Sequence, residues 1–238
     1  MLTMRTPAWK KLARIVAWPL RSGWPDEARR IVQGPILSRM IARSSLTPRR
    51  GLTILNAGAG EGSFSSLLLA IPGAARVVEM DYGYRIRPLS TYDSHQHAVA
   101  ASLTAIPIQS ATFNFVLCSE VLEHIDDDAL ALDELCRVLA PGGWLLISVP
   151  TPPAVYDPNH VREGYIAGDL TRMLSDRGLS VVDTAYCMYG SFKLVLRGWN
   201  RFGSLPRGLL WILALADRIW HIGTPMDLIV LSRLPPAV

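Results

Sequence analysis

The sequence has few cysteines and no long apolar run. Three of its 238 residues are cysteine, and Cys118, Cys136 and Cys187 lie far apart in apolar surroundings. This spacing excludes a disulfide framework and favours three small core residues in a reducing compartment. The longest unbroken apolar run, residues 209–216, is far shorter than the roughly 18 residues that a membrane-spanning helix needs.

Acidic residues are scarce at the N-terminal end. Residues 1–50 hold eleven lysines and arginines against Asp26 and Glu27, a net charge of +9, whereas the remaining residues sum to −5 and the whole chain to +4. The basic character therefore belongs to the N-terminal extension. Because a nucleic-acid groove would need positive charge across the main domain, we expect no nucleic-acid partner.

A glycine-rich turn follows the first strong strand pattern. Residues 52–56 form an apolar run ending in Asn56, which is typical of a buried parallel strand. Gly58, Gly60 and Gly62 follow at alternate positions, and apolar residues on one helical face come after them. A strand that enters a helix through such a turn is the nucleotide-binding corner of an open α/β sheet, where glycine lets the backbone approach a ligand closely.

The glycine spacing distinguishes two kinds of nucleotide. A dinucleotide fingerprint, G-x-G-x-x-G, needs a glycine where this chain has Ser63. Glu61, at the expected helix start, would also repel a pyrophosphate bound there. The loop therefore favours a nucleoside without a phosphate chain, although such turns also occur without any ligand.

The second strand is expected over residues 76–81 and ends in an acid. Asp81 lies 23 positions after Gly58, close to the offset of about 20 residues at which an acidic side chain meets ribose hydroxyls. Its carboxylate can accept hydrogen bonds from both hydroxyls, and the Tyr82 ring can lie against an adenine. The alternative for Asp81 is a solvated charge at the strand end.

The glycine motif and two later blocks resemble the class I S-adenosylmethionine-dependent methyltransferases, especially those of the quinone-biosynthesis type. The first block, residues 102–125, contains a Phe-Asn pair that opens a strand and then a Leu-Glu-His run. The second block, residues 135–150, is typical of a helix stopped by Pro-Gly-Gly and followed by a buried strand. The resemblance extends from residue 52 to residue 185.

The resemblance implies an α/β fold, a Rossmann-like three-layer sandwich. Its seven-stranded sheet is mostly parallel, with the last strand antiparallel, and this chain adds N-terminal helices and a helical insertion before that strand. We expect a helix over residues 126–139 and the last two strands at 179–186 and 227–232. The expected segments are an N-terminal helical extension at 1–50, the methyltransferase core at 51–188, the apolar insertion at 189–225, and the final strand and tail at 226–238.

The resemblance also implies S-adenosylmethionine as cofactor, released as S-adenosylhomocysteine. The residues expected to bind it are Asn56, Gly58, Ala59, Gly60, Asp81, Tyr82, Ser102, Leu103, Cys118 and Glu120. Asn56, Ser102 and Asn114 stand where the family pattern has acids. Their side chains can still form hydrogen bonds, but the lost carboxylates predict a weaker attraction for a cofactor with sulfonium and ammonium groups.

The expected activity is methyl transfer to a small or lipophilic acceptor by in-line displacement, in which the protein mainly aligns the reacting atoms. A base is needed only if the acceptor atom carries a proton. His124 and His160 are the candidates, because histidine changes charge near neutral pH and both residues lie at carboxyl ends of strands; a structural role is the alternative for each. No metal-ligand spacing is present in the sequence, so we predict no metal site.

Two other functions are weighed against methyl transfer. The lost acids keep open a non-catalytic binding or assembly protein with the same fold. A nicotinamide-dependent oxidoreductase is disfavoured by Ser63 and by the Leu-Glu-His run.

The extension and the insertion share tryptophans set among arginines and lysines. Trp9 and Trp18 lie near Lys10, Lys11 and Arg14, and these charges also argue against a signal peptide. We therefore expect a cytoplasmic protein. Tryptophan beside basic residues suits a membrane interface, so peripheral membrane contact is one expectation. A lid over the acceptor, a homodimer surface, or a helical subdomain packed on the N-terminal helices are the alternatives for the insertion.

Overall fold

The structure is a computed structural model that describes residues 22–44, 46, 51–82, 94–154 and 157–237. Its contacts divide the chain into two compact units. We call residues 34–187 and 225–238 the sheet unit, and residues up to 33 together with 188–224 the helical unit. The predicted N-terminal segment with Trp9 and Trp18 lies outside the described residues.

The sheet unit is built on seven strands in the spatial order β4-β3-β2-β5-β6-β9-β7. Neighbouring strands are parallel except β9, which runs antiparallel to both β6 and β7. The predicted seven-stranded sheet with an antiparallel last strand is therefore confirmed. The strands are β2 (Leu52–Ala57), β3 (Ala74–Asp81), β4 (Gln96–Ala100), β5 (Phe113–Ser119), β6 (Leu139–Pro150), β7 (Ser180–Cys187) and β9 (Asp227–Arg233).

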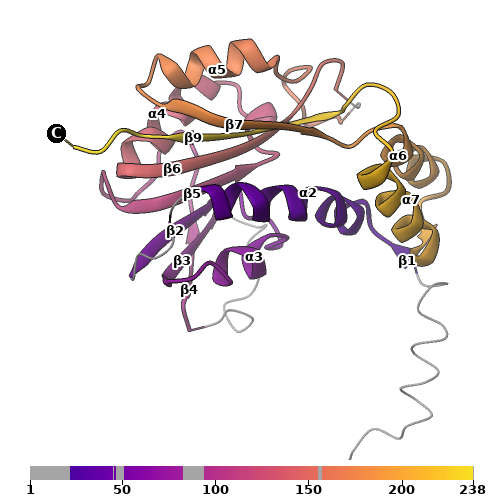
Figure 1. Ribbon diagram of the computed structural model, residues 1–238, viewed down its shortest axis with the longest axis horizontal. Coiled ribbons are helices and arrows are strands. Elements are labelled where there is room, and N and C mark those ends of the chain that lie inside the picture. Colours follow the sequence, from indigo (N-terminus) through magenta and orange to yellow (C-terminus); the bar gives the residue numbers. More distant parts are fainter. Residues whose placement is uncertain (1–21, 45, 47–50, 83–93, 155–156, 238) are drawn as a thin grey trace, which may run out of the picture. The chain divides into compact units, whose positions relative to one another are not determined.

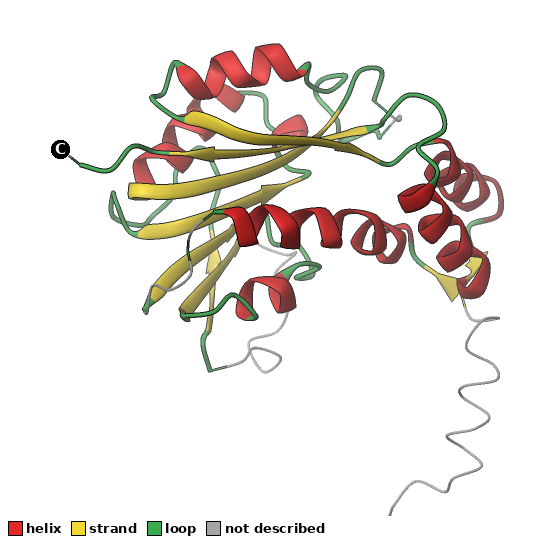
Figure 2. Cartoon of the chain, viewed as in Figure 1, coloured by secondary structure: helices red, strands yellow, loops and turns green. Residues whose placement is uncertain are grey.

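Helices cover both faces of this sheet (Figure 1, Figure 2). Alternate strand residues such as Leu55 and Val116 form one buried cluster with Leu135 of α4 and Leu170 of α5, because side chains alternate across a strand. The short helix α3 contacts β2 and β3. The helices are α2 (Pro25–Arg43), whose residues from Gly34 onward belong to the sheet unit, α3 (Ser65–Leu69), the 3-10 turn η4 (Leu122–His124), α4 (Asp128–Val138) and α5 (Ala167–Ser175).

The Pro-Gly-Gly run does not stop α4, as the sequence predicted. Asp127 caps the start of α4 by accepting a hydrogen bond from the Leu130 N–H, and the helix ends at Val138. Strand β6 begins at the next residue. Its pairing with β5 jumps from Leu139 to Trp144, so the residues between them, with Gly142 at a φ of 74°, form an irregularity within the strand.

The helical unit contains α6 (Gly190–Phe202) and α7 (Arg207–Ile219), so the insertion is helical as predicted. Short strands β1 (Ser22–Gly23) and β8 (Leu205–Pro206) pair antiparallel within it. The Glu27 carboxylate accepts hydrogen bonds from Arg207 Nε at 2.9 Å and from Trp211 Nε1 at 2.8 Å. The first turn of α2 is therefore bound to α7. Among the helices just described, none combines the length and apolar character that a membrane crossing demands.

A buried acid joins the two helices of this unit. Asp217 of α7 is 1% exposed, and its carboxylate accepts hydrogen bonds at 2.9 Å from the N–H groups of Tyr189 and Phe192. These two N–H groups lie at the start of α6, where the helix has no internal acceptors for them. The carboxylate therefore fixes the start of one helix against the middle of the other.

Replacing Asp217 by Ala should lower the free energy of unfolding by about 1.5–3 kcal/mol, because the N–H groups at the start of α6 lose a charged acceptor in a buried place. Chemical denaturation measures the change. Asp169→Ala is the control, since Asp169 forms only an exposed ion pair with Arg172 and should cost less than about 1 kcal/mol. Equal losses in the two variants would contradict the capping role.

Candidate functional site

The residues proposed from the sequence gather at the carboxyl ends of the parallel strands. Parallel strands point the same way, so these ends share one edge of the sheet, where ligands bind in open α/β folds. Along the chain, Gly58, Ala59 and Gly60 follow β2, Asp81 ends β3 and Tyr82 follows it, Ser102 and Leu103 follow β4, Cys118 and Glu120 lie at the end of β5, and His124 and His160 lie in the segments after β5 and β6.

Hydrogen bonds hold the glycine loop against the end of β3. The N–H groups of Gly58 and Ala59 both donate to the Met80 carbonyl oxygen, at 2.8 and 2.9 Å. The Gly60 N–H donates to Asp81 Oδ2 at 2.7 Å. Asp81 is buried, and a charged acceptor in a buried place forms strong hydrogen bonds. The carboxylate at the end of β3 therefore sets the path of the loop after β2.

The first two glycines of the loop have different surroundings. Both have positive φ angles, 74° at Gly58 and 52° at Gly60. A Cβ on Gly58 would lie 2.1 Å from Cγ2 of Val121, whereas a Cβ on Gly60 would meet nothing within 4 Å. Gly58 is therefore required by packing against the segment after β5. Gly60 leaves open space beside its backbone, which fits a bound nucleoside.

Asn56 takes part in a buried network that the sequence did not predict. Its Nδ2 donates to Glu79 Oε2 at 2.6 Å, and Gln96 Nε2 donates to Glu79 Oε1 at 2.8 Å. Glu79 is 1% exposed and Asn56 pairs with it across β2 and β3. The carboxylate expected at residue 56 is thus present on the neighbouring strand. The signal for it was an acid inside the apolar run of residues 76–81.

Asn114 does not belong to the site. Its Oδ1 accepts a hydrogen bond from the Thr53 N–H at 2.9 Å, next to the irregular pairing at the starts of β2 and β5. The site lies at the opposite ends of these strands. The sequence interpretation of Asn114 as a charge lost near the cofactor is therefore wrong, because this side chain completes the sheet instead.

The other proposed cofactor residues lie in contrasting surroundings. Tyr82 is 71% exposed, and its N–H donates to Asp81 Oδ1. Ser102 Oγ accepts a hydrogen bond from the Thr104 N–H and shapes the turn after β4. Leu103 and Cys118 have side chains in the hydrophobic core, so only their backbone is left to contact a ligand. Burial raises the pKa of the Cys118 thiol, which keeps it protonated.

Glu120 lies at a sharp backbone turn directly after β5. Its φ is 56°, a left-handed conformation that residues other than glycine seldom adopt. Its N–H donates to the Ser148 carbonyl oxygen, and the Ser148 hydroxyl donates to Glu120 Oε1 at 2.8 Å. The end of β6 therefore holds this carboxylate at the edge where the site residues gather.

The structure brings the two candidate bases together. The rings of His124 and His160 are 4.8 Å apart between centroids and meet edge to face. Nδ1 of His124 lies 3.1 Å from the Asn159 carbonyl oxygen, which can only accept, so Nδ1 carries the proton of the neutral ring and Nε2 has the lone pair. Nε2 lies 3.8 Å from Oε1 of the buried Glu123. This carboxylate would stabilise a proton taken up by His124.

Charged groups of the segment after β6 surround the histidines. Asp157 Oδ1 accepts hydrogen bonds from the backbone N–H and the Nδ2 of Asn159 at 2.8 and 2.9 Å. Burial alone would raise the pKa of Asp157, but these hydrogen bonds and the nearby His160 and His124 rings hold it below its usual value. Asp157 therefore stays ionised beside the two rings.

Three side chains fasten this segment to the start of α4. The Arg162 guanidinium binds the Asp128 carboxylate and donates to the Ile125 carbonyl oxygen at 2.6 Å. The Tyr165 hydroxyl also donates to Asp128, at 2.8 Å. Burial raises the pKa of Tyr165, so the hydroxyl stays a donor. The position of His160 is thus fixed from the Arg162 side of its loop.

Glu123, His124 and His160 each place one potential ligand atom within 4.8 Å of the others. Two imidazoles and a carboxylate are donors that bind transition metals, so the arrangement is compatible with a divalent cation. The sequence predicted no metal, and that statement stays a prediction.

The comparison with known families now decides what kind of domain carries this edge. Residues 55–147, from β2 to β6, match the family model described as a methyltransferase domain. The sheet unit is a class I methyltransferase domain. Its glycine loop, its Asp81 and its Leu-Glu-His run are the parts on which the resemblance was based.

Curated relatives of this methyltransferase domain have related names. A probable S-adenosylmethionine-dependent methyltransferase of Mycolicibacterium smegmatis is 32% identical over 155 residues, which cover 59% of this chain and 57% of the relative. A demethylmenaquinone methyltransferase of Clavibacter sepedonicus is 31% identical over 150 residues, covering 58% of this chain and 59% of the relative. The chain thus spans little more than half the length of these relatives.

Solved structures share the fold at low sequence identity. A putative methyltransferase from Bacillus halodurans has a TM-score of 0.59 at 16% identity, covering 85% of this chain and 100% of that one. The [4+2]-cyclase SpnF has a TM-score of 0.57 at 14% identity, covering 85% of this chain and 81% of that one. Since a cyclase shares it, the fold alone does not fix the reaction.

The two glycines should respond differently to alanine. Gly58→Ala is expected to lower the melting temperature, because its Cβ would collide with Val121. Gly60→Ala should fold, although its positive φ is strained by about 1 kcal/mol, and should weaken S-adenosylmethionine binding. Calorimetric titration and thermal unfolding measure both effects. A Gly60→Ala variant that binds the cofactor as tightly as the unaltered chain would show that the open space at Gly60 is not the cofactor site.

Asn56→Asp should destabilise the fold by about 2–4 kcal/mol at neutral pH, because it buries two carboxylates at hydrogen-bond distance and one partner of Glu79 is lost. The variant pair takes up a proton on folding, so the loss should shrink at about pH 5. Adding Glu79→Gln should restore more than half of the stability. If the double variant were no more stable than Asn56→Asp alone, the network would not be the cause.

Proposed function

We propose that this chain transfers the methyl group of S-adenosylmethionine to a small or lipophilic acceptor. The observation that carries the proposal is the glycine loop closed on Asp81, with the Gly60 N–H 2.7 Å from Oδ2, at the ligand-binding edge of a methyltransferase domain. The open space beside Gly60 and the carboxylate at the end of β3 suit a nucleoside with ribose hydroxyls.

The residues present fit this cofactor. Asp81 would accept hydrogen bonds from the ribose, the exposed Tyr82 ring would lie against the adenine, and the backbone at Gly58 and Gly60 would meet the methionine part. Glu120, at the end of β5, would attract the ammonium group. When bound, S-adenosylmethionine supplies a methyl group on a positively charged sulfur, so the protein has only to position the acceptor and remove a proton where there is one.

His124 is the favoured base of the two histidines. Its Nδ1 is held by the Asn159 carbonyl oxygen, which leaves Nε2 as the atom able to take a proton. The nearby Glu123 carboxylate favours the charged ring that results. His160, in edge contact with it, would orient the ring or take the proton itself.

The names of the relatives support a small or lipid-related acceptor. Beside the demethylmenaquinone methyltransferase, a malonyl-[acyl-carrier protein] O-methyltransferase of Methylovorus is 26% identical over 143 residues, which cover 56% of this chain and 48% of that protein. A non-catalytic binding or assembly role is the alternative. Its support is weaker than the sequence suggested, because Asn114 lies away from the site and Glu79 stands beside Asn56.

Three sequence predictions belong to this proposal: a cytoplasmic location, peripheral contact with a membrane, and a homodimer. The first experiment concerns the activity itself. Purified chain, S-adenosylmethionine and an extract of small molecules and lipids are incubated with EDTA, and S-adenosylhomocysteine release is followed by mass spectrometry. Release that depends on the extract supports methyl transfer. A folded chain that binds the cofactor but releases none with any extract would favour the non-catalytic role.

His124→Gln should lower kcat by about 10²–10⁴-fold for an acceptor that loses a proton, the usual loss for a general base. The KM for S-adenosylmethionine should not change, and the rise of the rate with pH should flatten. His97→Gln is the control, because His97 is exposed on β4 and should leave kcat unchanged. An unaltered kcat in His124→Gln and in His160→Gln would remove both histidines from the reaction.

A further inference from the structure

Helix α7 is apolar on the side that faces solvent. Its inward side chains, Leu210 and Ala214, are fully buried. At 100° per residue, the outward residues fall within a sector about 120° wide, centred opposite Leu210. A surface helix normally has polar residues there. This stripe, which we call the α7 stripe, consists of Leu209, Ile212, Leu215 and Ile219, exposed by 45, 65, 41 and 70%.

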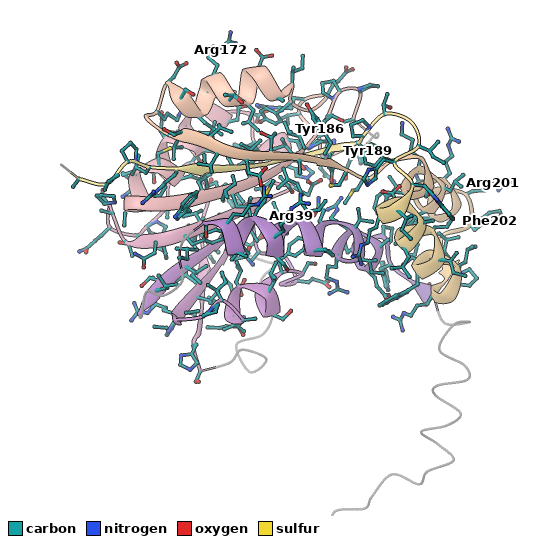
Figure 3. The ribbon with its side chains drawn as sticks, viewed as in Figure 1. Arg39, Arg172, Tyr186, Tyr189, Arg201 and Phe202 are labelled. Carbon is teal, nitrogen blue, oxygen red and sulfur yellow. The ribbon has the colours of Figure 1, made fainter. Side chains whose placement is uncertain are left out.

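Other exposed apolar side chains lie in the same unit. Trp220 and Ile222, directly after α7, are 59 and 68% exposed. At the end of α6, Phe202 is 72% exposed and the Arg201 guanidinium lies 5.6 Å from the centre of its ring. Figure 3 shows both side chains at the C-terminal end of α6. An exposed ring with a cation beside it is suited to a boundary between apolar and charged surroundings.

The charge of this helical pair is almost entirely positive. Its only acid is Asp217, which is 1% exposed and bound to the start of α6. Arg207 is paired with Glu27, but the other cations of α6 and α7 have no acid of these helices at the surface. The basic residues from 190 to 224 are Lys193, Arg197, Arg201, Arg207 and Arg218.

We propose that the α7 stripe, with the arginines around it, binds the surface of an anionic lipid membrane. The isoleucines and leucines would enter the boundary between headgroups and acyl chains, and Arg201 and Arg218 would meet lipid phosphates. This inference deepens the proposed function by giving a lipophilic acceptor a source. It concerns the helical unit alone and needs no cofactor.

Charge and hydrophobicity together favour a membrane over other partners. Nucleic acid would engage the arginines through its phosphates but would leave four exposed apolar residues in water. A second copy docked through the same stripe would bring two strongly basic surfaces together, which is unfavourable. An anionic bilayer satisfies both features, because it offers negative phosphates above an apolar layer.

Co-sedimentation of the full chain with vesicles tests the proposal. Vesicles of phosphatidylcholine alone are compared with an equal mixture of phosphatidylcholine and phosphatidylglycerol. The chain should pellet with the mixed vesicles, pellet weakly with phosphatidylcholine, and dissociate as salt is raised. Equal binding to both vesicles, or to neither, would overturn the proposal.

Variants locate the surface. Ile212→Ser combined with Ile219→Ser should weaken binding to the mixed vesicles on the order of tenfold or more. Arg201→Gln and Arg218→Gln should each weaken it about fivefold. Val182→Ser is the matched control, since Val182 is 53% exposed on β7 of the sheet unit, and it should bind like the unaltered chain. Circular dichroism shows that each variant is folded.

Two outcomes separate this inference from its competitors. If the double isoleucine variant kept full vesicle binding, the α7 stripe would not be the surface. If sedimentation velocity showed that the variant loses a dimer while vesicle binding is unchanged, the stripe would be an interface between copies. Vesicle binding is measured without S-adenosylmethionine, so its failure would leave methyl transfer standing, and a chain without transferase activity could still bind vesicles.

Discussion

The hydrogen bond between the Gly60 N–H and Asp81 joins the two strands on which the site depends. With the two N–H groups that bind the Met80 carbonyl oxygen, it fixes the loop after β2 to the end of β3. The loop then packs through Gly58 against Val121, which leads into the Leu-Glu-His turn. The histidines follow from that turn. A change in the Asp81 clamp would therefore reach the cofactor loop first and the candidate bases second.

The buried network beneath the loop changes the meaning of one sequence feature. An asparagine in place of an acid suggested a weakened cofactor site, but Asn56 donates its amide hydrogen to Glu79 on the next strand. One buried carboxylate bound by two amides is easier to accommodate than two facing carboxylates. The negative charge has moved by one strand and has not disappeared. Asn114, at the far end of β5, bears on the sheet alone.

Much of the fold could be predicted because its signals are local. Apolar runs, the glycine turn and the strand-end Asp81 specify strands and a ligand corner without knowledge of distant contacts. The missed features all depend on distant partners. Nothing in the sequence tells that Val121 occupies the space beside Gly58, that Gln96 binds Glu79, or that Cys118 points into the core. The Pro-Gly-Gly run was misjudged because a turn signal also fits an irregularity within a strand.

The central claim is that the loop closed on Asp81 is a site for S-adenosylmethionine. Calorimetric titration of the unaltered chain with this cofactor tests it most directly, with Asp81→Ala and a nicotinamide dinucleotide as comparisons. The account predicts saturable binding at one site, a loss of about 1.5–3 kcal/mol in Asp81→Ala, and no heat with the dinucleotide. No heat from the folded chain at millimolar S-adenosylmethionine, or equal binding by Asp81→Ala, would contradict it.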